Sequence, residues 1–201
     1  MNKRKILVLV LSLVLVLTCA VAGVLAWLSA KTETVTNTFA PSTIGLTLDE
    51  AEYDAESNTL KTNRVQANSS YKMVPGWVLP KDPPVTVTAG SEACWVFLKV
   101  EKENYPDTYL DYTIDSGWTE LPGETGVYYR KVTSTESAQE FAVLTGDQVT
   151  VKSSLTQTEL GKLTAATYPK LTFTAYAIQL YTNYNEEQPV ADAWTEAQKL
   201  G

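Results

Sequence analysis

Three observations predict that most of this chain folds as an all-β domain, either a sandwich or a barrel. Behind Trp27 the sequence is rich in Thr, Val, Tyr and Trp, residues that favour strands. Short runs of alternating apolar and polar residues recur there, and turn-forming Gly, Pro, Asn and Asp separate them. The stretch before Trp27 has a different, Leu- and Val-rich composition. We therefore expect a single β domain behind a separate N-terminal segment.

The N-terminal segment has the parts of an export signal in their usual order. A basic stretch, Lys3 to Lys5, precedes an uncharged run from Ile6 to Ala30, which is long enough to span a bilayer as a helix. Val24-Leu25-Ala26 offers a small-x-small exit that makes Trp27 the new N-terminus, and Leu28-Ser29-Ala30 offers a second one. A cleaved signal and a retained anchor both fit, and either leaves the rest of the chain outside the cytoplasm.

These boundaries divide the chain into a signal or anchor at 1–26, an N-terminal strand segment at 27–40 and a β domain at 41–201. The whole chain has a net charge of −7. Residues 1–26 hold three basic residues and no acidic one, so without them the net charge is −10. Such an acidic domain repels phosphates, which excludes nucleic acid as a partner. We expect membrane contact only through the N-terminal segment.

The alternating runs locate the strands of the domain. Ala93 to Val100 has apolar residues on both faces, which predicts a central strand. Leu171 to Tyr181 is the longest strand signal and predicts a bend or bulge. Residues 49–69 are polar and without a clear period, which predicts an irregular segment. The full set of predicted strands is 32–39, 44–48, 71–74, 84–88, 93–100, 127–132, 140–144, 148–152 and 171–181.

Two short helices are predicted as well. Thr156 to Leu163 opens with the sequence Thr-Gln-Thr-Glu, which is a capping pattern. Val190 to Leu200 places its apolar residues at helical spacing, and Gly201 suits the end of a helix. Leu121 to Gly126 is similar to a sortase signal but has one residue too many, so it predicts a turn between strands.

The chain contains no His. This excludes a Ser-His-Asp triad, a Cys-His dyad and an HExxH zinc site. No G-x-G-x-x-G or Walker-type loop is present either. We therefore expect no enzyme, no catalytic or metal-ligating residues and no cofactor. A metallopeptidase would have to use carboxylates alone.

Two further features could carry chemistry. The acidic stretch Asp49 to Glu56 could hold a hard cation such as calcium, but it lacks the spacing and the Gly of an EF-hand, so a solvated loop is favoured. Cys94 is the thiol that remains once Cys19 leaves with the signal, which rules out an intramolecular disulfide. Its alternation with Val96 and Leu98 favours a buried apolar position over a reactive one.

Several segments, taken in order, resemble one family. Residues 22–48 are similar to the export signal and first strands of the TasA/camelysin family of Gram-positive bacteria, whose signal is cut by a SipW-type peptidase. Pro75-Gly76 and Lys81-Asp82-Pro83 are similar to a "PG…KDP" stretch of that family. Phe173 to Gln179 and Ala193-Trp194 are similar to its C-terminal end.

The resemblance implies a jelly-roll-like β-sandwich and a role as a structural or accessory subunit of fibres in the extracellular biofilm matrix. The implied partners are further copies of the chain or related fibre subunits, and a SipW-type signal peptidase that cuts between Ala26 and Trp27. In fibre-forming members the mature N-terminal segment adds as a strand to the next subunit, and such open head-to-tail addition builds a filament. The candidate assembly strand here is Thr34, Val35, Thr36, Asn37, Thr38 and Phe39.

Three alternatives remain open at this point. The same residues could form an ordinary first strand within their own sheet. Camelysin has been described as a metalloprotease, although nothing in this sequence supports that activity. A monomeric surface adhesin is the third reading, because export and a β domain do not by themselves require assembly.

Overall fold

The computed structural model describes residues 2–28, 42–69, 71–183 and 185–200, apart from the side chains of residues 19–28. The chain divides into two units, Met1–Ala40 and Pro41–Gly201. The first unit contains helix α1, Lys3–Leu28. Within the described residues, no helix combines the length and apolar character needed to cross a membrane. The predicted strand at 32–39 lies outside the described residues.

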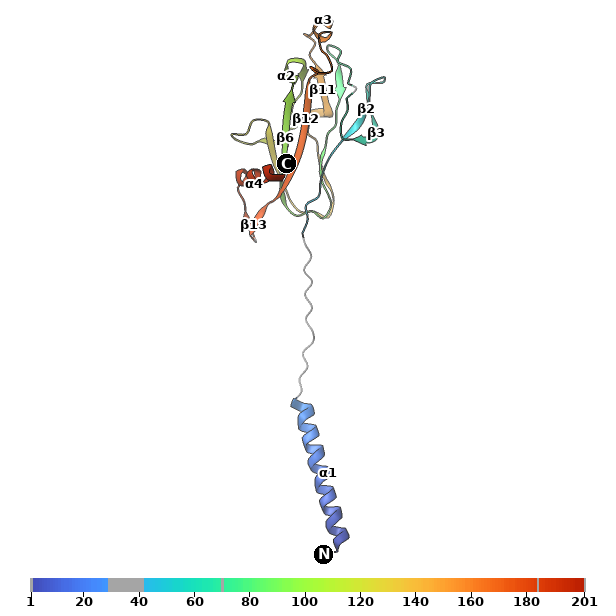
Figure 1. Cartoon of the computed structure of the whole chain (residues 1–201), viewed down its shortest axis with the longest axis vertical. Helices are drawn as coiled ribbons and strands as arrows, with labels where there is room; N and C mark the ends of the chain where they lie inside the picture. The colour runs from blue at the N-terminus through green and yellow to red at the C-terminus, as the bar shows by residue number, and fades with distance from the viewer. Residues whose placement is uncertain (1, 29–41, 70, 184, 201) are drawn as a thin grey trace. The chain divides into compact units, whose positions relative to one another are not determined.

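The second unit is built mostly from strands arranged in several sheets (Figure 1). The largest sheet has four antiparallel strands in the order β12 (Lys170–Gln179), β6 (Cys94–Glu103), β9 (Val127–Val132) and β8 (Thr119–Glu120). One three-stranded sheet has the order β1 (Leu46–Leu48), β5 (Val85–Val87) and β10 (Gln139–Phe141). The other has the order β4 (Val78–Pro80), β11 (Gln148–Val151) and β7 (Leu110–Asp111).

Two hairpins and several short helices complete the second unit. The hairpins pair β2 (Glu50–Asp54) with β3 (Thr59–Val65), and β13 (Tyr181–Asn183) with β14 (Glu186–Glu187). The α-helices are α2 (Pro106–Tyr109), α3 (Gln157–Leu160) and α4 (Val190–Ala197). Two 3₁₀ turns are η1 (Thr145–Asp147) and η2 (Gln198–Leu200).

Strand β6 is the centre of the unit, as its two apolar faces predict. It pairs with β12 along its whole length and with β9 along six residues. Its Cys94, Val96 and Leu98 pack in a core with residues of β5 and β11, so the four-stranded sheet faces both three-stranded sheets across this core. On the opposite face, Phe97 contacts Trp194 of α4 with ring centroids 5.3 Å apart. Strand β6 therefore contributes side chains to two apolar clusters, one on each face of its sheet.

The local predictions with a strong pattern are confirmed. Thr156 and Glu159 form both halves of a capping box at the start of α3, because each side chain satisfies the other residue's backbone N–H. Helix α4 forms within the predicted range. The predicted turn lies between β8 and β9, where Gly123 has a φ of 86°. The long strand signal ends at a break, since β12 stops at Gln179 and the fully buried Leu180 separates it from β13.

Two predictions from the region before β5 are wrong. Residues 49–69 are not irregular, because they form the β2–β3 hairpin with Ala51 and Tyr53 buried. The acidic residues between them hide the alternation in the sequence. Residues 71–74 form no strand and lead instead into the turn at Pro75 and Gly76. Strands β4, β7, β8 and β14 have only two or three residues each, and the sequence predicted none of them.

Candidate functional site

The outer edge of β12 is the first feature that suggests a function. Its inner edge pairs with β6 along all ten residues. Among the described residues no strand pairs with its outer edge, because β12 is the terminal strand of its sheet. Unpaired N–H and C=O groups along such an edge form a template for another strand.

The ladder shows which backbone groups face outward. Ala93, which precedes β6, accepts a hydrogen bond of 2.9 Å from the N–H of Leu180, so these two residues point toward each other. In an antiparallel pair, inward and outward backbone groups alternate along each strand. The even-numbered residues of β12 therefore bond to β6. The outward N–H and C=O groups belong to the odd-numbered residues Leu171, Phe173, Ala175, Ala177 and Gln179, and the carbonyl of Gln179 accepts a hydrogen bond from the Gln188 side chain.

The sequence of β12 does not protect this edge. Natural edge strands usually carry a charge or a Pro in their middle, which blocks pairing with another chain. From residue 171 to residue 179 the strand has no charged residue, no Pro and no Gly. Its one basic residue, Lys170, lies at the end and pairs with Glu103 at 2.9 Å. The middle of β12 thus lacks the charges and the Pro that commonly block pairing at an edge.

Apolar side chains next to this edge are only half-buried. Strand β1 lies beside β12. The partly exposed side chains that pack onto the first core here are Ile44, Leu46 and Leu48 from the β1 region and Leu171, Phe173, Ala175 and Ala177 from β12. Residues of β6 on the same face are fully buried, Val96 and Leu98 among them. Within the described residues, the core is therefore incompletely covered at the β1–β12 margin.

An ion pair lies beside the same margin. The Lys81 amino group and the Glu50 carboxylate form a salt bridge, and their side chains are only 14% and 8% exposed. Lys81 Nζ lies 5.5 Å from the ring centroid of Tyr71 and 5.8 Å from that of Phe173. Because Phe173 belongs to β12, this pair joins the start of the β2–β3 hairpin to the neighbourhood of the open edge.

Asp82 extends this pair into a network. Its carboxylate accepts the backbone N–H of Ala51 at 2.8 Å and a guanidinium N–H of Arg64 at 2.8 Å. Arg64 also pairs with Asp49 at 2.7 Å. Pro83 follows directly and is buried before β5. Lys81 and Asp82 thus tie the hairpin to the segment between β4 and β5.

Tyr71 is the least satisfied polar group of this network. Its ring stacks on Tyr53 with centroids 4.3 Å apart. Its phenolic oxygen is buried and has no hydrogen-bond partner among the described residues. Burial, and then the negative charges of Glu50 and Asp82, raise the pKa of Tyr71 above its ordinary value. The hydroxyl therefore stays neutral and protonated at physiological pH.

Pro75 and Gly76 serve a separate purpose. The N–H of Trp77 donates to the carbonyl of Val74 at 3.0 Å, which closes a turn, and Gly76 has a φ of 82° that favours glycine. The N–H of Gly76 donates to Val151 in β11 at 2.9 Å. Strand β4 separates this turn from Lys81 along the chain. The motif therefore comprises a turn and an ion-pair anchor.

The acidic stretch is not the solvated loop that the sequence favoured. Asp49 and Glu50 pair with Arg64 and Lys81, and Glu52 pairs with Lys61 at 2.6 Å. Cations from the same chain thus neutralise these carboxylates. In the part of the chain that the structure describes, no three acidic or Cys side chains are grouped so that they could hold a metal ion.

Cys94 lies where its alternation predicts. The side chain is fully buried in the first core, and burial raises the pKa of its thiol to about 11. A thiol that stays protonated in a closed core is a poor nucleophile. The candidate assembly strand, residues 34–39, lies outside the described residues. Of the predicted cleavage residues Ala26 and Trp27 only the backbone is described, in α1.

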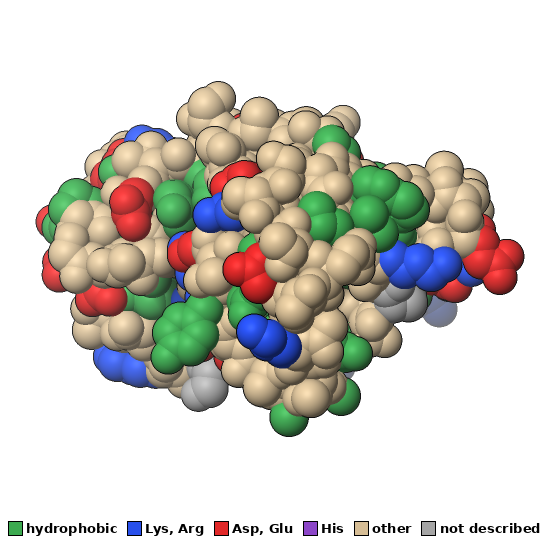
Figure 2. All heavy atoms as spheres, turned by 90° about the horizontal axis from the view of Figure 1, so that it is seen from above, with side chains coloured by type: hydrophobic (Ala, Val, Ile, Leu, Met, Phe, Trp, Pro, Cys, Tyr) green, Lys and Arg blue, Asp and Glu red, His purple; other side chains and the backbone are tan. Residues whose placement is uncertain are grey.

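Charges elsewhere on the domain are mixed. On the face in Figure 2, Lys and Arg side chains lie interspersed with Asp and Glu.

Comparisons of this chain with protein-family models, with curated proteins and with solved structures give no match. Three features bear on function: the open β12 edge, its half-buried neighbours and the sequence of the N-terminal segment.

Proposed function

We propose that this chain is an exported structural or accessory subunit of extracellular fibres, and that the fibres assemble by strand addition. The observation that carries the proposal is the uncharged outer edge of β12 beside a margin of half-buried core residues. The resemblance to the TasA/camelysin family supports the same function, with a jelly-roll-like sandwich as the fold. It also implies a location on the surface or in the biofilm matrix of a Gram-positive bacterium.

The proposed donor is the segment Thr34 to Phe39 of a neighbouring copy. It alternates and contains no Pro, so it suits pairing along an open edge. Val35, Asn37 and Phe39 share one face. Placed against the β1–β12 margin, Val35 and Phe39 would cover the half-buried core residues. Full burial of each such apolar side chain contributes about 1.5–3 kcal/mol, in addition to the new backbone hydrogen bonds.

Export would control this assembly. While residues 1–26 remain attached, the donor segment directly behind them is tethered to the hydrophobic segment. Cleavage between Ala26 and Trp27 by a SipW-type peptidase would release the donor, so each subunit would become competent to pair only after export. The acceptor edge needs no such activation, because it belongs to the folded domain.

Microscopy of two purified forms tests this function. Protein comprising residues 27–201 should form filaments under negative stain. Protein comprising residues 41–201, which lacks the donor but keeps the acceptor edge, should remain as separate particles. A synthetic peptide of residues 27–40 should bind the shortened form, because it supplies the missing strand. Monodisperse particles from the longer form, even after seeding or acid treatment, would reject self-assembly and favour an adhesin.

A further inference from the structure

The Lys81–Glu50 pair is the least exposed ion pair among the described residues. Its side chains are 14% and 8% exposed, whereas the next least exposed pair, Arg64 with Asp82, has values of 36% and 26%. The two partners come from segments separated by the whole hairpin. Burial of two charges is costly because both lose their hydration. A reaction that removes both charges would remove this cost.

The surroundings hold the two groups close together. Two aromatic rings, from Tyr71 and Phe173, flank Lys81 Nζ and limit the access of water. The N–H of Asn68 donates to the second oxygen of Glu50 at 3.0 Å, which fixes the carboxyl group while its first oxygen contacts the amine. Two reactants that are held together and correctly aligned reach effective concentrations of about 10⁵–10⁸ M.

We propose that Lys81 and Glu50 condense to form an isopeptide bond between Nζ of the lysine and Cδ of the glutamate. The product is a neutral amide, which removes the desolvation penalty of the ion pair and keeps the hairpin attached covalently to the segment before β5. The bond does not depend on fibre formation, because both groups belong to one folded domain.

The condensation balances without any other reactant. A proton first moves from the Lys81 ammonium to the Glu50 carboxylate, which gives a neutral amine and a neutral acid. Nζ then attacks Cδ, so that a C–N bond forms. The C–O bond breaks, and the hydroxyl leaves as water together with one proton from the amine. No electrons are transferred.

Tyr71 is assigned as the catalytic residue for these proton transfers. Its hydroxyl is buried and without a partner among the described residues, and its ring lies beside Lys81 Nζ. A neutral hydroxyl both donates and accepts hydrogen bonds, so in the proposed step it relays a proton from the attacking nitrogen to the departing oxygen. Asp82 is unsuited to this role, because Arg64 and the N–H of Ala51 already occupy its oxygens.

Mass spectrometry of the full-length chain tests the bond directly. The intact protein should be lighter than its sequence by one water molecule. Trypsin should fail to cleave after Lys81, and should release a branched peptide in which Thr32–Lys61 is joined to Met73–Lys99. An intact mass equal to the sequence mass, together with a free peptide ending at Lys81, would overturn the proposal.

Two variants complete the test. Lys81→Arg keeps the positive charge but lacks the amine, so its mass should equal its sequence mass. Tyr71→Phe keeps the ring and removes the hydroxyl, and it should accumulate the bond at least tenfold more slowly in a time course after purification. An unchanged rate in Tyr71→Phe would overturn the assignment of Tyr71.

Discussion

Strands β12 and β3 are both paired on only one side among the described residues, but they differ in charge and in their apolar surroundings. Strand β3 carries Lys61 and Arg64, and both are held in ion pairs with acidic residues. Strand β12 carries no charge between residues 171 and 179 and lies beside a half-buried apolar margin. Charged edges resist further pairing, whereas uncharged ones invite it.

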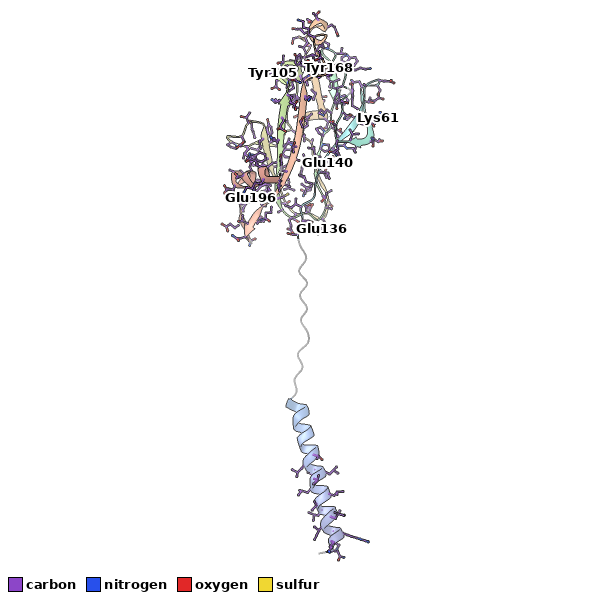
Figure 3. The ribbon with its side chains drawn as sticks, in the orientation of Figure 1. Lys61, Tyr105, Glu136, Glu140, Tyr168 and Glu196 are labelled. Atoms are coloured by element: carbon purple, nitrogen blue, oxygen red, sulfur yellow. The ribbon has the colours of Figure 1, made fainter. Side chains whose placement is uncertain are left out.

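This difference in charge indicates that the two edges have different roles within one domain. The β2–β3 hairpin, with Lys61 at its exposed side in Figure 3, is held to the domain by charges. The β12 edge would be completed by a strand from another copy. Substitutions in the hairpin should therefore change the stability of the subunit, and substitutions in β12 should change assembly.

The largest effect is expected at the buried anchor. Relative to protein in which the proposed Lys81–Glu50 bond has not yet formed, Lys81→Met leaves the Glu50 carboxylate buried without its partner, which should lower the free energy of unfolding by about 3–5 kcal/mol. Urea denaturation followed by Trp fluorescence measures this value. The double variant Lys81→Met/Glu50→Met should recover much of the loss, because no unpaired charge remains. Equal losses in the single and double variants would contradict this account of the anchor.

A block of the β12 edge should prevent assembly without unfolding the subunit. In Ala175→Pro the lost N–H is one that faces outward, so pairing with β6 is kept. An unpaired donor-strand carbonyl costs about 1–3 kcal/mol, which should raise the critical concentration for fibres about tenfold or more. Ala175→Ser keeps the N–H and should assemble normally. Sedimentation of fibres measures both variants, and equal critical concentrations would argue against this edge.

Acid should loosen the hairpin before it affects β12. The hydrogen bond from Lys61 lowers the pKa of Glu52, and the backbone N–H of Glu56 lowers that of Asp54. A carboxylate with a lowered pKa stabilises the fold above its unfolded-state pKa, and this contribution is lost as pH falls through the lower folded-state value. NMR signals of the hairpin should therefore change below about pH 4, while those of residues 94–98 in β6 and 173–177 in β12, which carry no carboxylate, stay constant. Simultaneous changes would contradict the comparison.

The smallest effect is expected at the exposed end of the hairpin. The Lys61–Glu52 pair has side chains that are 47% and 36% exposed, and such pairs contribute at most about 1 kcal/mol. Lys61→Gln should lower the free energy of unfolding by less than that and leave the critical concentration of fibres unchanged. A loss as large as that of Lys81→Met would show that exposure does not separate the two pairs.

The sequence predicts the core strands well because their apolar residues alternate at short range. Strand β6 has buried side chains on both faces, and this pattern is visible without a structure. The sequence does not reveal the hairpin, because Ala51 and Tyr53 are its only buried apolar residues among those described. Its other anchors are long-range contacts: Glu50 pairs with Lys81, and the Asp82 carboxylate accepts the N–H of Ala51. Local periodicity contains no record of such contacts.

The candidate site was predictable only in part. The motif of Lys81, Asp82 and Pro83 was found from resemblance, but its role as an anchor depends on partners from the hairpin. The edge position of β12 could not be predicted, because β12 and β6 both have apolar residues on two faces and differ only in what pairs with them. Two apolar faces indicate that a strand is covered on both sides, but they do not show whether a second strand pairs with it.

Residue-specific hydrogen exchange in fibres and monomers is the most direct test of strand addition at β12. The account predicts that amides of Phe173, Ala175 and Ala177, which face outward, exchange rapidly in the monomer and become protected in fibres. Amides of Thr172, Thr174 and Tyr176, which bond to β6, should be protected in both. Fibres in which the outward amides exchange as rapidly as in the monomer would contradict the central claim.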